Sequence, residues 1–194
     1  MNIPDAIEQV VMQMNADGVD LKFQYGHPKE VQQVLMEKTK DSAKKYEKYP
    51  LLIMFLDYEE QIGQSDKHYI SEASITMVFV APTDKNYKAQ ERKEKVFRPV
   101  LWPLYEQFMS YLQLSNYFDT DVKGLIPHNK TDRYFYSADE AKAQNVFAAY
   151  FDAVEITNLE LKLMEQGCEG NIIEYVTHNG ELVTHNEEAV TWQN

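Results

Sequence analysis

The chain has 194 residues, 44% of them hydrophobic, so it is long enough to bury one core and fits one domain or one domain with an appendage. Acidic residues outnumber basic ones by 31 to 19, and the formal net charge of −12 disfavours direct binding to DNA or RNA phosphates. The single cysteine, Cys168, excludes an internal disulfide and any multi-cysteine zinc site. With no basic signal-peptide start and no apolar run approaching ~20 residues, we expect a soluble, cytoplasmic protein without a membrane span.

The N-terminal part predicts a helix, a strand and a second helix. Apolar residues recur at helical spacing over 3–14, and Asp17-Gly18 marks the end of that helix. Residues 21–25 alternate between apolar and polar side chains, which is typical of a short half-buried strand. A second helical pattern begins at Val31 and fades into the lysine-rich run 38–48, which we interpret as a solvated helix face rather than a phosphate-binding groove.

Two adjacent strands are predicted next, with an antiparallel pairing. Residues 51–56 are all apolar, as in a buried central strand. Residues 57–60 end that strand, and the polar segment that follows, up to Lys67, is expected to be a loop. The second strand covers 69–80, and its alternation places on one face Ala73, Ile75, Met77 and Phe79.

The stretch Glu91–Ser115 is expected to form the central helix of the fold. Its apolar residues follow one helical face: Phe97, Leu101, Leu104, Phe108 and Leu112. Pro99 disfavours the helical conformation at the residue before it, so the helix should start afresh at Pro99 or bend there. Pro103 removes a further backbone donor, which predicts a kink at the start of the apolar part. We interpret the stretch as a long kinked helix packed across a sheet.

The segment after this helix is expected to be largely irregular. A long surface loop is predicted over Asn116–Thr131, and a short strand over Asp132–Tyr136. Residues 151–164 predict a long strand, but the apolar side chains change parity at Thr157-Asn158. Such a change requires a β-bulge, so one long bent strand is predicted.

The chain ends in a predicted β-hairpin over 171–192 that turns at Asn179-Gly180, the favoured pair for a two-residue turn. The predicted fold class is therefore α+β: a mixed, mainly antiparallel sheet with a long kinked helix packed across it, plus a C-terminal hairpin arm. We place the core domain at 1–166 and the arm at 167–194.

No catalytic or metal-binding motif is visible. The five histidines lack the spacing of a zinc protease, and a metal held by His178 and His185 across the hairpin is less favoured than two surface histidines. Asp57, Glu59 and His68 are the remaining candidates for acid–base chemistry, but an acidic turn facing solvent is the favoured interpretation, because nothing supplies a partner base or a phosphate loop. We therefore expect no enzyme, no catalytic residue, no cofactor and no metal.

Several segments together carry a resemblance to a known family: the helix Ile3–Asp17, the strand segment Tyr49–Ile53, the long strand Ala73–Val80, the helix residues Leu101–Tyr105 followed by Ser115–Phe118, and the closing strand Asp152–Leu161. Their order resembles the tail-terminator (tail-completion) proteins of long-tailed bacteriophages and their prophage relatives. The longer loops and the extra hairpin depart from that pattern. An adaptor, stopper or neck-ring role at the head–tail junction is thus a related alternative.

The resemblance implies a structural virion protein without cofactor or catalysis. It implies a homo-oligomeric ring, commonly a hexamer, that contacts tail-tube and neck or connector proteins and lets DNA pass through its lumen. Such a protein would be found in the virion, and in the host cytoplasm during assembly, without a membrane partner or specific nucleic-acid binding.

Each subunit of such a ring meets its neighbours through two different surfaces, and a C-terminal arm can add a strand to a neighbour's sheet. The candidate interface residues are Ile172, Ile173, Tyr175 and Val176. The alternative function is a cytoplasmic adaptor that binds a protein through a sheet edge and a tyrosine-rich surface.

Overall fold

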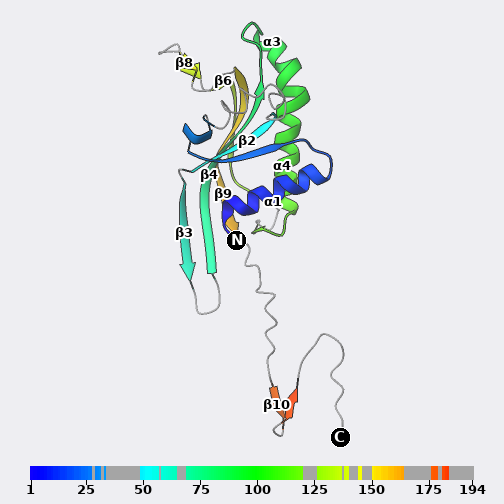
Figure 1. Ribbon diagram of the computed structural model, residues 1–194, viewed down its shortest axis with the longest axis vertical. Helices are drawn as coiled ribbons and strands as arrows, with labels where there is room; N and C mark the ends of the chain where they lie inside the picture. The colour runs from blue at the N-terminus through cyan, green and yellow to red at the C-terminus, as the bar shows by residue number, and fades with distance from the viewer. Residues whose placement is uncertain are drawn as a thin grey trace. The chain divides into compact units, whose positions relative to one another are not determined.

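The structure is a computed structural model that describes residues 1–27, 29–31, 33, 49–56, 58–64, 69–119, 126–136, 138–139, 144–145, 150–163, 176–178 and 181–183. Contacts divide the chain into two units, Met1–Met164 and Glu165–Asn194. The first unit has the predicted α+β fold, with a long helix packed on a curled, mainly antiparallel sheet (Figure 1).

The elements of the first unit are α1 (Ile3–Ala16), β1 (Lys22–Gly26), β2 (Leu51–Phe55), β3 (Glu59–Gln64), β4 (Tyr69–Pro82), α3 (Ala89–Arg92), the π-helical segment η1 (Lys93–Leu101), α4 (Trp102–Leu114), β5 (Phe118–Asp119), β6 (Asn129–Tyr136), β7 (Ala138–Asp139), β8 (Gln144–Asn145) and β9 (Phe151–Leu163). Strands β7 and β8, which pair with each other, were not predicted.

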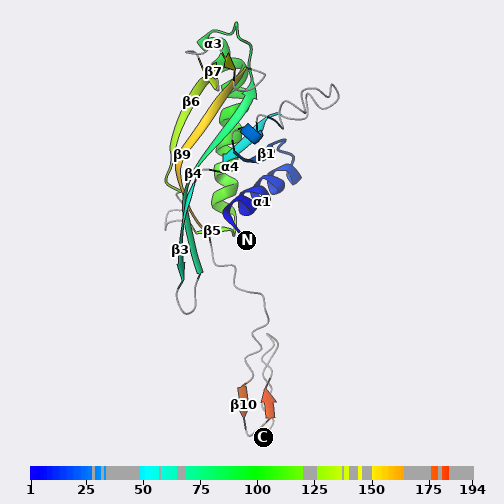
Figure 2. The ribbon, with the colours of Figure 1, turned by 60° about the vertical axis from the view of Figure 1, so that its left-hand side comes forward.

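The main sheet is built around β4, which pairs antiparallel with β2 and β3 along one side and with β9 along the other. β1 extends the sheet beyond β2 as its parallel neighbour, and β5 and β6 both pair antiparallel with β9. The predicted antiparallel pairing of the two apolar strands is therefore correct. Figure 2 shows the sheet curling around the long helix, with the β3–β4 hairpin extending past the helices.

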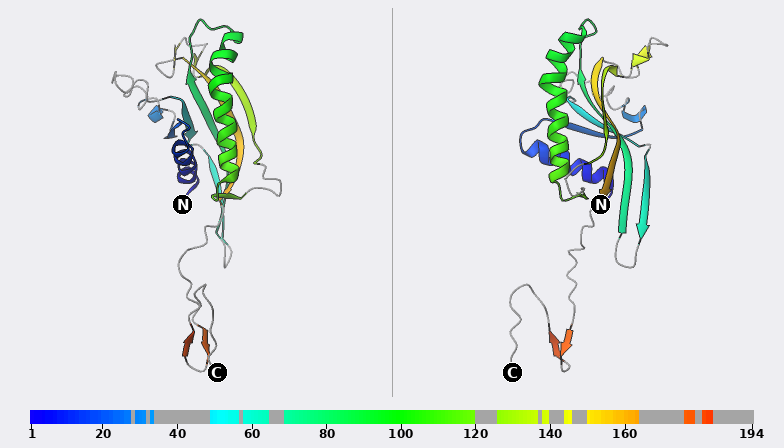
Figure 3. Two further views of the ribbon diagram at one scale, coloured as in Figure 1. Left: turned by 90° about the vertical axis from the view of Figure 1, so that its right-hand side faces the viewer. Right: turned by 180° about the vertical axis from the view of Figure 1, so that it is seen from behind.

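Helices α1 and α4 cover one face of the sheet, which we call the inner face (Figure 3). The main core lies between these helices and the sheet. Every residue of the predicted helical face is buried in it: Phe97, Leu101, Leu104, Phe108 and Leu112. The predicted strand face from Ala73 to Phe79 joins the same core. The opposite, outer face carries a smaller core that includes Val31, Val78 and Val80.

The long helix does not start afresh at Pro99, which was one of the two predicted outcomes. It begins at Ala89 and continues to Leu114, with Pro99 inside the π-helical segment η1. In a π-helix each N–H bonds to the carbonyl five residues earlier, as the Trp102 N–H does with Phe97. Pro99 has no N–H to donate, but the helix continues through this residue within the π-helical hydrogen-bond pattern.

Two predicted loops contain strands. Residues 59–64 form β3, although neither face of this strand is apolar. The strand pairs with β4 through backbone hydrogen bonds, and such bonds produce no alternation of apolar and polar residues in the sequence. Within 116–131 the structure has β5 and the start of β6, so the predicted strand at 132–136 begins earlier, at Asn129. The strand β5 is only two residues long, too short to carry a periodic signal.

The predicted bulge in β9 is confirmed. The register between β4 and β9 shifts between the pairs Ile75–Leu159 and Met77–Ile156, and Asn158 has a φ of 52°. The extra residue reverses which side chains of the second half of the strand face each side of the sheet. As a result, Ile156 and Leu159 both face the main core despite their opposite parity.

The second unit contains β10 (Val176–His178) and β11 (Glu181–Val183), an antiparallel pair. His178 pairs with Glu181, so residues 179–180 connect the strands, which agrees with the predicted two-residue hairpin. Of the candidate interface residues, Val176 pairs with Val183, whereas Ile172, Ile173 and Tyr175 lie outside the described residues. Within the described part of the chain, no helix is long and apolar enough to cross a membrane.

Candidate functional site

Two rows of polar side chains cross the outer face of the sheet near the β3–β4 hairpin. Directly opposed residues of antiparallel strands project from the same face, so the registers define these rows. The first row, from β3 through β4 and β9 to β5, is Gln61, Glu72, Lys162 and Asp119. The second row, from β3 through β4 to β9, is Glu59, Ser74 and Glu160.

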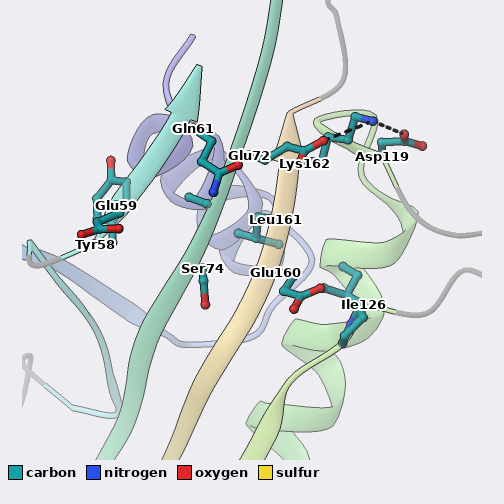
Figure 4. A pocket seen from close by; sticks show the side chains of 12 residues that line it. Tyr58, Glu59, Gln61, Glu72, Ser74, Asp119, Ile126, Glu160, Leu161 and Lys162 are labelled. Atoms are coloured by element: carbon teal, nitrogen blue, oxygen red, sulfur yellow. Dashed lines mark ion pairs between the residues drawn. The ribbon is translucent and has the colours of Figure 1, made fainter. Parts of the chain in front are cut away.

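These rows form one wall of a groove of about 600 Å³. Figure 4 shows their side chains spread over three neighbouring strands, with Asp119 and Ile126 closing one side. The groove is also lined by apolar groups: Tyr58, Ala73, Ile126, Pro127 and Leu161. We call this feature the acidic groove, since four of its lining residues are carboxylates and one is a lysine.

The charges in the acidic groove are unevenly balanced. Lys162 Nζ lies 3.4 Å from Glu72 Oε1 and 3.8 Å from Asp119 Oδ2, so this lysine is shared by two acids. Among the described residues, neither Glu59 nor Glu160 forms an ion pair. Both side chains are exposed, and the groove therefore presents net negative charge to whatever enters it.

Tyr58, at the edge of the acidic groove, keeps its hydroxyl proton well above neutral pH. Burial, followed by the charges of Tyr25 and Glu60 and a hydrogen bond with Tyr25, raises the pKa of Tyr58 to about 12. Glu60 in turn accepts a hydrogen bond from the buried Ser71 hydroxyl. The Tyr58 and Ser71 hydroxyls serve as hydrogen-bonding groups, and neither is arranged as a nucleophile with an adjacent base.

A second polar cluster lies between α4 and β6. Trp102 Nε1 donates to Asp132 Oδ2 at 3.0 Å, and Lys130 Nζ lies 3.3 Å from Asp132 Oδ1. The same ammonium group stands over two aromatic rings, 5.1 Å from the Tyr105 centroid and 5.5 Å from that of Trp102. Each charged or polar head is thus satisfied inside the subunit, and the cluster fastens β6 to the helix.

His128 belongs to this cluster and uses both ring nitrogens. Its Nδ1 lies 2.7 Å from the Ile126 carbonyl, which can only accept, so Nδ1 carries the proton. Nε2 then accepts from the Tyr105 hydroxyl at 2.7 Å. Burial, with the charge of Glu106, raises the pKa of Tyr105, which keeps that hydroxyl a donor. A metal would have to displace both hydrogen bonds.

Arg92 and Asp152 form a buried ion pair that the sequence did not reveal. Arg92 Nη1 lies 2.6 Å from Asp152 Oδ1, and both side chains are almost fully buried. The guanidinium also donates to the carbonyls of Tyr87 and Asp84 and to the Thr83 hydroxyl. These bonds hold the connection between β4 and α3, so the pair is structural.

The histidine and carboxylate candidates named from the sequence lie only partly within the described residues. Glu59 lies in the acidic groove, whereas Asp57 and His68 lie outside the described residues, as do His185 and Cys168. No group of three or more metal-ligating side chains occurs among the residues that the structure describes. The acidic groove was missed because residues 59–64 were expected to be a loop, and cross-strand rows become visible only once a register is known.

Comparison with known proteins gave no match, either to a protein-family model or to a curated protein. Function is therefore inferred from the surfaces themselves.

Proposed function

We propose that the protein is a structural subunit of the tail-terminator or neck type, which assembles into a homo-oligomeric ring at the tail end or head–tail junction of a bacteriophage. The observation that carries the proposal is that the main sheet has open edges on both sides. In the described residues β3 pairs with β4 alone, and β5 and β6 pair with β9 alone. A closed ring needs two different surfaces on each subunit, and two unlike sheet edges provide them.

The β3–β4 hairpin supports the same proposal. It extends beyond the helices in every view (Figures 1 and 2), and its Ile62 side chain is 60% exposed. A two-stranded hairpin without a covering layer gains little stability by itself. A large apolar side chain on such an element is best explained by burial against a neighbouring subunit.

The C-terminal unit would supply a second contact. We propose that Ile172, Ile173, Tyr175 and Val176 pair with an open sheet edge of a neighbouring subunit, since strand addition needs only backbone donors and acceptors plus alternate side chains. Deleting residues 171–194 should then reduce the oligomer to smaller species in light scattering. An intact oligomer after this deletion would remove the arm from the interface.

The net charge of −12 fits a lumen through which DNA passes without adhering, because an acidic wall repels phosphates. The ring would contact tail-tube and neck proteins in the virion, after assembly in the host cytoplasm. Neither catalysis nor a cofactor is part of this proposal.

The deciding experiment is electron microscopy of the purified full-length chain at low and high concentration, with mass photometry on the same samples. We expect closed rings whose central hole admits a DNA duplex of about 20 Å, wider than either of its grooves. A strict monomer at every concentration would contradict self-assembly into a ring.

The second candidate function is a protein-binding adaptor, and β6 is the observation that favours it. Its Tyr134 is 50% exposed and lies 5.6 Å, between ring centroids, from Phe97. An extended peptide can add to such an edge and place alternate side chains on the aromatic rings. A monomer that binds one partner stoichiometrically, with binding lost on Tyr134→Ala, would favour the adaptor over the ring.

A further inference from the structure

A cluster of basic side chains lies at the other end of the first unit from the acidic groove. Residues 84–98, which include α3 and most of η1, contain six basic and three acidic residues, in a chain whose total charge is −12. Arg92 is buried, and the other five basic side chains are exposed: Lys85, Lys88, Lys93, Lys95 and Arg98. We call this surface the basic helix patch.

Within the basic helix patch, Lys93 and Arg98 are available to a partner. Lys95 Nζ lies 3.3 Å from Glu91 Oε1 and 4.3 Å from the centroid of the Tyr87 ring, so its charge is partly used. In the described part of the chain, neither Lys93 nor Arg98 forms an ion pair. The two residues are five positions apart in the π-helical segment, whose backbone hydrogen bonds also join residues five positions apart. Their side chains therefore project from a similar side of the helix.

The basic helix patch cannot reach the acidic groove of its own subunit. Strand β4 runs from the groove at Ser74 to Pro82, just before the patch, which corresponds to roughly 26 Å at about 3.3 Å per residue. Figures 1 and 3 show α3 and the β3–β4 hairpin at opposite ends of the sheet. Any contact between the two charged surfaces must therefore join two copies of the chain.

We propose that the acidic groove receives the basic helix patch of a second copy. Glu59 and Glu160 lie on strands flanking β4, about 10 Å apart at the usual strand spacing. Lys93 and Arg98 are separated by roughly 7 Å along the helix axis, and their long stems cover the difference. Two free cations of one copy thus face two free carboxylates of the next.

This contact is heterologous, because each copy contributes its groove on one side and its helix on the other. A heterologous contact repeats from copy to copy, and it closes into a ring when the rotation between successive copies allows closure. The inference rests on the proposed ring and specifies which two surfaces of the subunit meet. It also predicts that the oligomer dissociates at high salt, since exposed charges are screened within about 10 Å at 0.1 M ionic strength.

The test compares charge-reversed variants of the full-length chain by mass photometry and analytical ultracentrifugation. The groove variant is Glu59→Lys with Glu160→Lys, and the patch variant is Lys93→Glu with Arg98→Glu. The swap variant carries all four substitutions. The matched control is Glu8→Lys with Glu106→Lys, which changes the net charge as the groove variant does, at exposed positions of α1 and α4. Circular dichroism establishes that each variant is folded.

We expect the groove and patch variants each to raise the dissociation constant of the oligomer at least about tenfold, because like charges then face each other. The swap variant should return to within a few fold of the unmodified chain, and the control should not change. An oligomer that forms normally in both single-surface variants, or a swap variant that does not recover, would overturn this contact and leave the ring intact. An unmodified chain that never assembles would overturn the ring proposal itself.

Discussion

Arg92 stabilises the connection between β4 and α3. Its guanidinium holds the backbone of residues 83–87 through two carbonyls and one hydroxyl, while Asp152 neutralises its charge. A planar fork with five donors can satisfy all of these groups at once, which a lysine cannot do. The position of α3, and of the basic helix patch that starts there, therefore depends on this one side chain.

Replacing Arg92 with methionine should lower the free energy of unfolding by about 3 kcal/mol, because it breaks the buried ion pair of Arg92 with Asp152. Urea denaturation followed by tryptophan fluorescence measures this change. The matched control is Arg133→Met, since Arg133 pairs with Glu155 at 2.7 Å but is 54% exposed. A surface pair of that kind should cost less than about 1 kcal/mol. Equal losses in the two variants would show that burial does not decide the cost.

Tyr58 predicts a pH dependence of stability at alkaline pH. Its pKa is raised from 10.0 to about 12 in the folded chain, so the unfolded chain loses the proton first. The stabilisation is fully present below pH 10 and is lost as the pH rises from 10 towards 12. Tyr58→Phe should therefore lose less stability than the unmodified chain between pH 9 and about pH 11.5 in urea denaturation. Tyr134→Phe, at an exposed tyrosine, is the control and should follow the unmodified chain.

Among the secondary-structure elements, β9 depends most on a single irregularity. Its bulge allows one continuous strand to pair with β4 over both halves while presenting Ile156 and Leu159 to the same core. The bulge also sets which residues of the second half face outwards, among them Glu160 and Lys162 of the acidic groove. A local backbone feature thus determines the chemistry of that surface.

Asn158→Ile should cost roughly 1–2 kcal/mol in the free energy of unfolding, because a β-branched side chain is strained at a φ of 52°. Asn158→Gly should be close to neutral, since glycine adopts this conformation without a steric cost. Thermal and urea denaturation of the two variants measure the difference. A glycine variant as unstable as the isoleucine variant would indicate that the asparagine side chain, and not the backbone, supports the bulge.

The sequence was informative wherever one face of an element is buried. Helix α1, strand β4 and the parity change at Thr157-Asn158 were all predicted, because apolar side chains recur there with the period of the element. It was uninformative for β3, whose polar residues carry no period, and for the pairing of Arg92 with Asp152, which are 60 residues apart. The acidic groove could not be predicted for both reasons. Finding it requires knowing that β3 is a strand and knowing the registers of three strand pairs.

At the scale of the whole molecule, charge is distributed unequally along the first unit. Among the described residues, the basic helix patch and the acidic groove lie at opposite ends of β4, in a chain of net charge −12. Opposite charges at opposite ends favour head-to-tail association and disfavour two identical surfaces meeting. This asymmetry supports the proposed ring and the proposed contact, as do the two sheet edges that are open among the described residues.

The division of the chain at Met164 predicts that the first unit folds without the second. Its main core is closed by α1, α4 and the sheet, and the described members of that core all precede residue 165. We therefore expect the chain truncated after Met164 to keep its free energy of unfolding within about 0.5 kcal/mol of the full-length value in urea denaturation, as for changes remote from a core. The truncated chain should also lose the contacts that we assign to the arm and form smaller oligomers at equal concentration. A loss of more than about 2 kcal/mol would place the C-terminal residues in the core of the first unit, because losses of that size come from buried groups and not from a surface appendage.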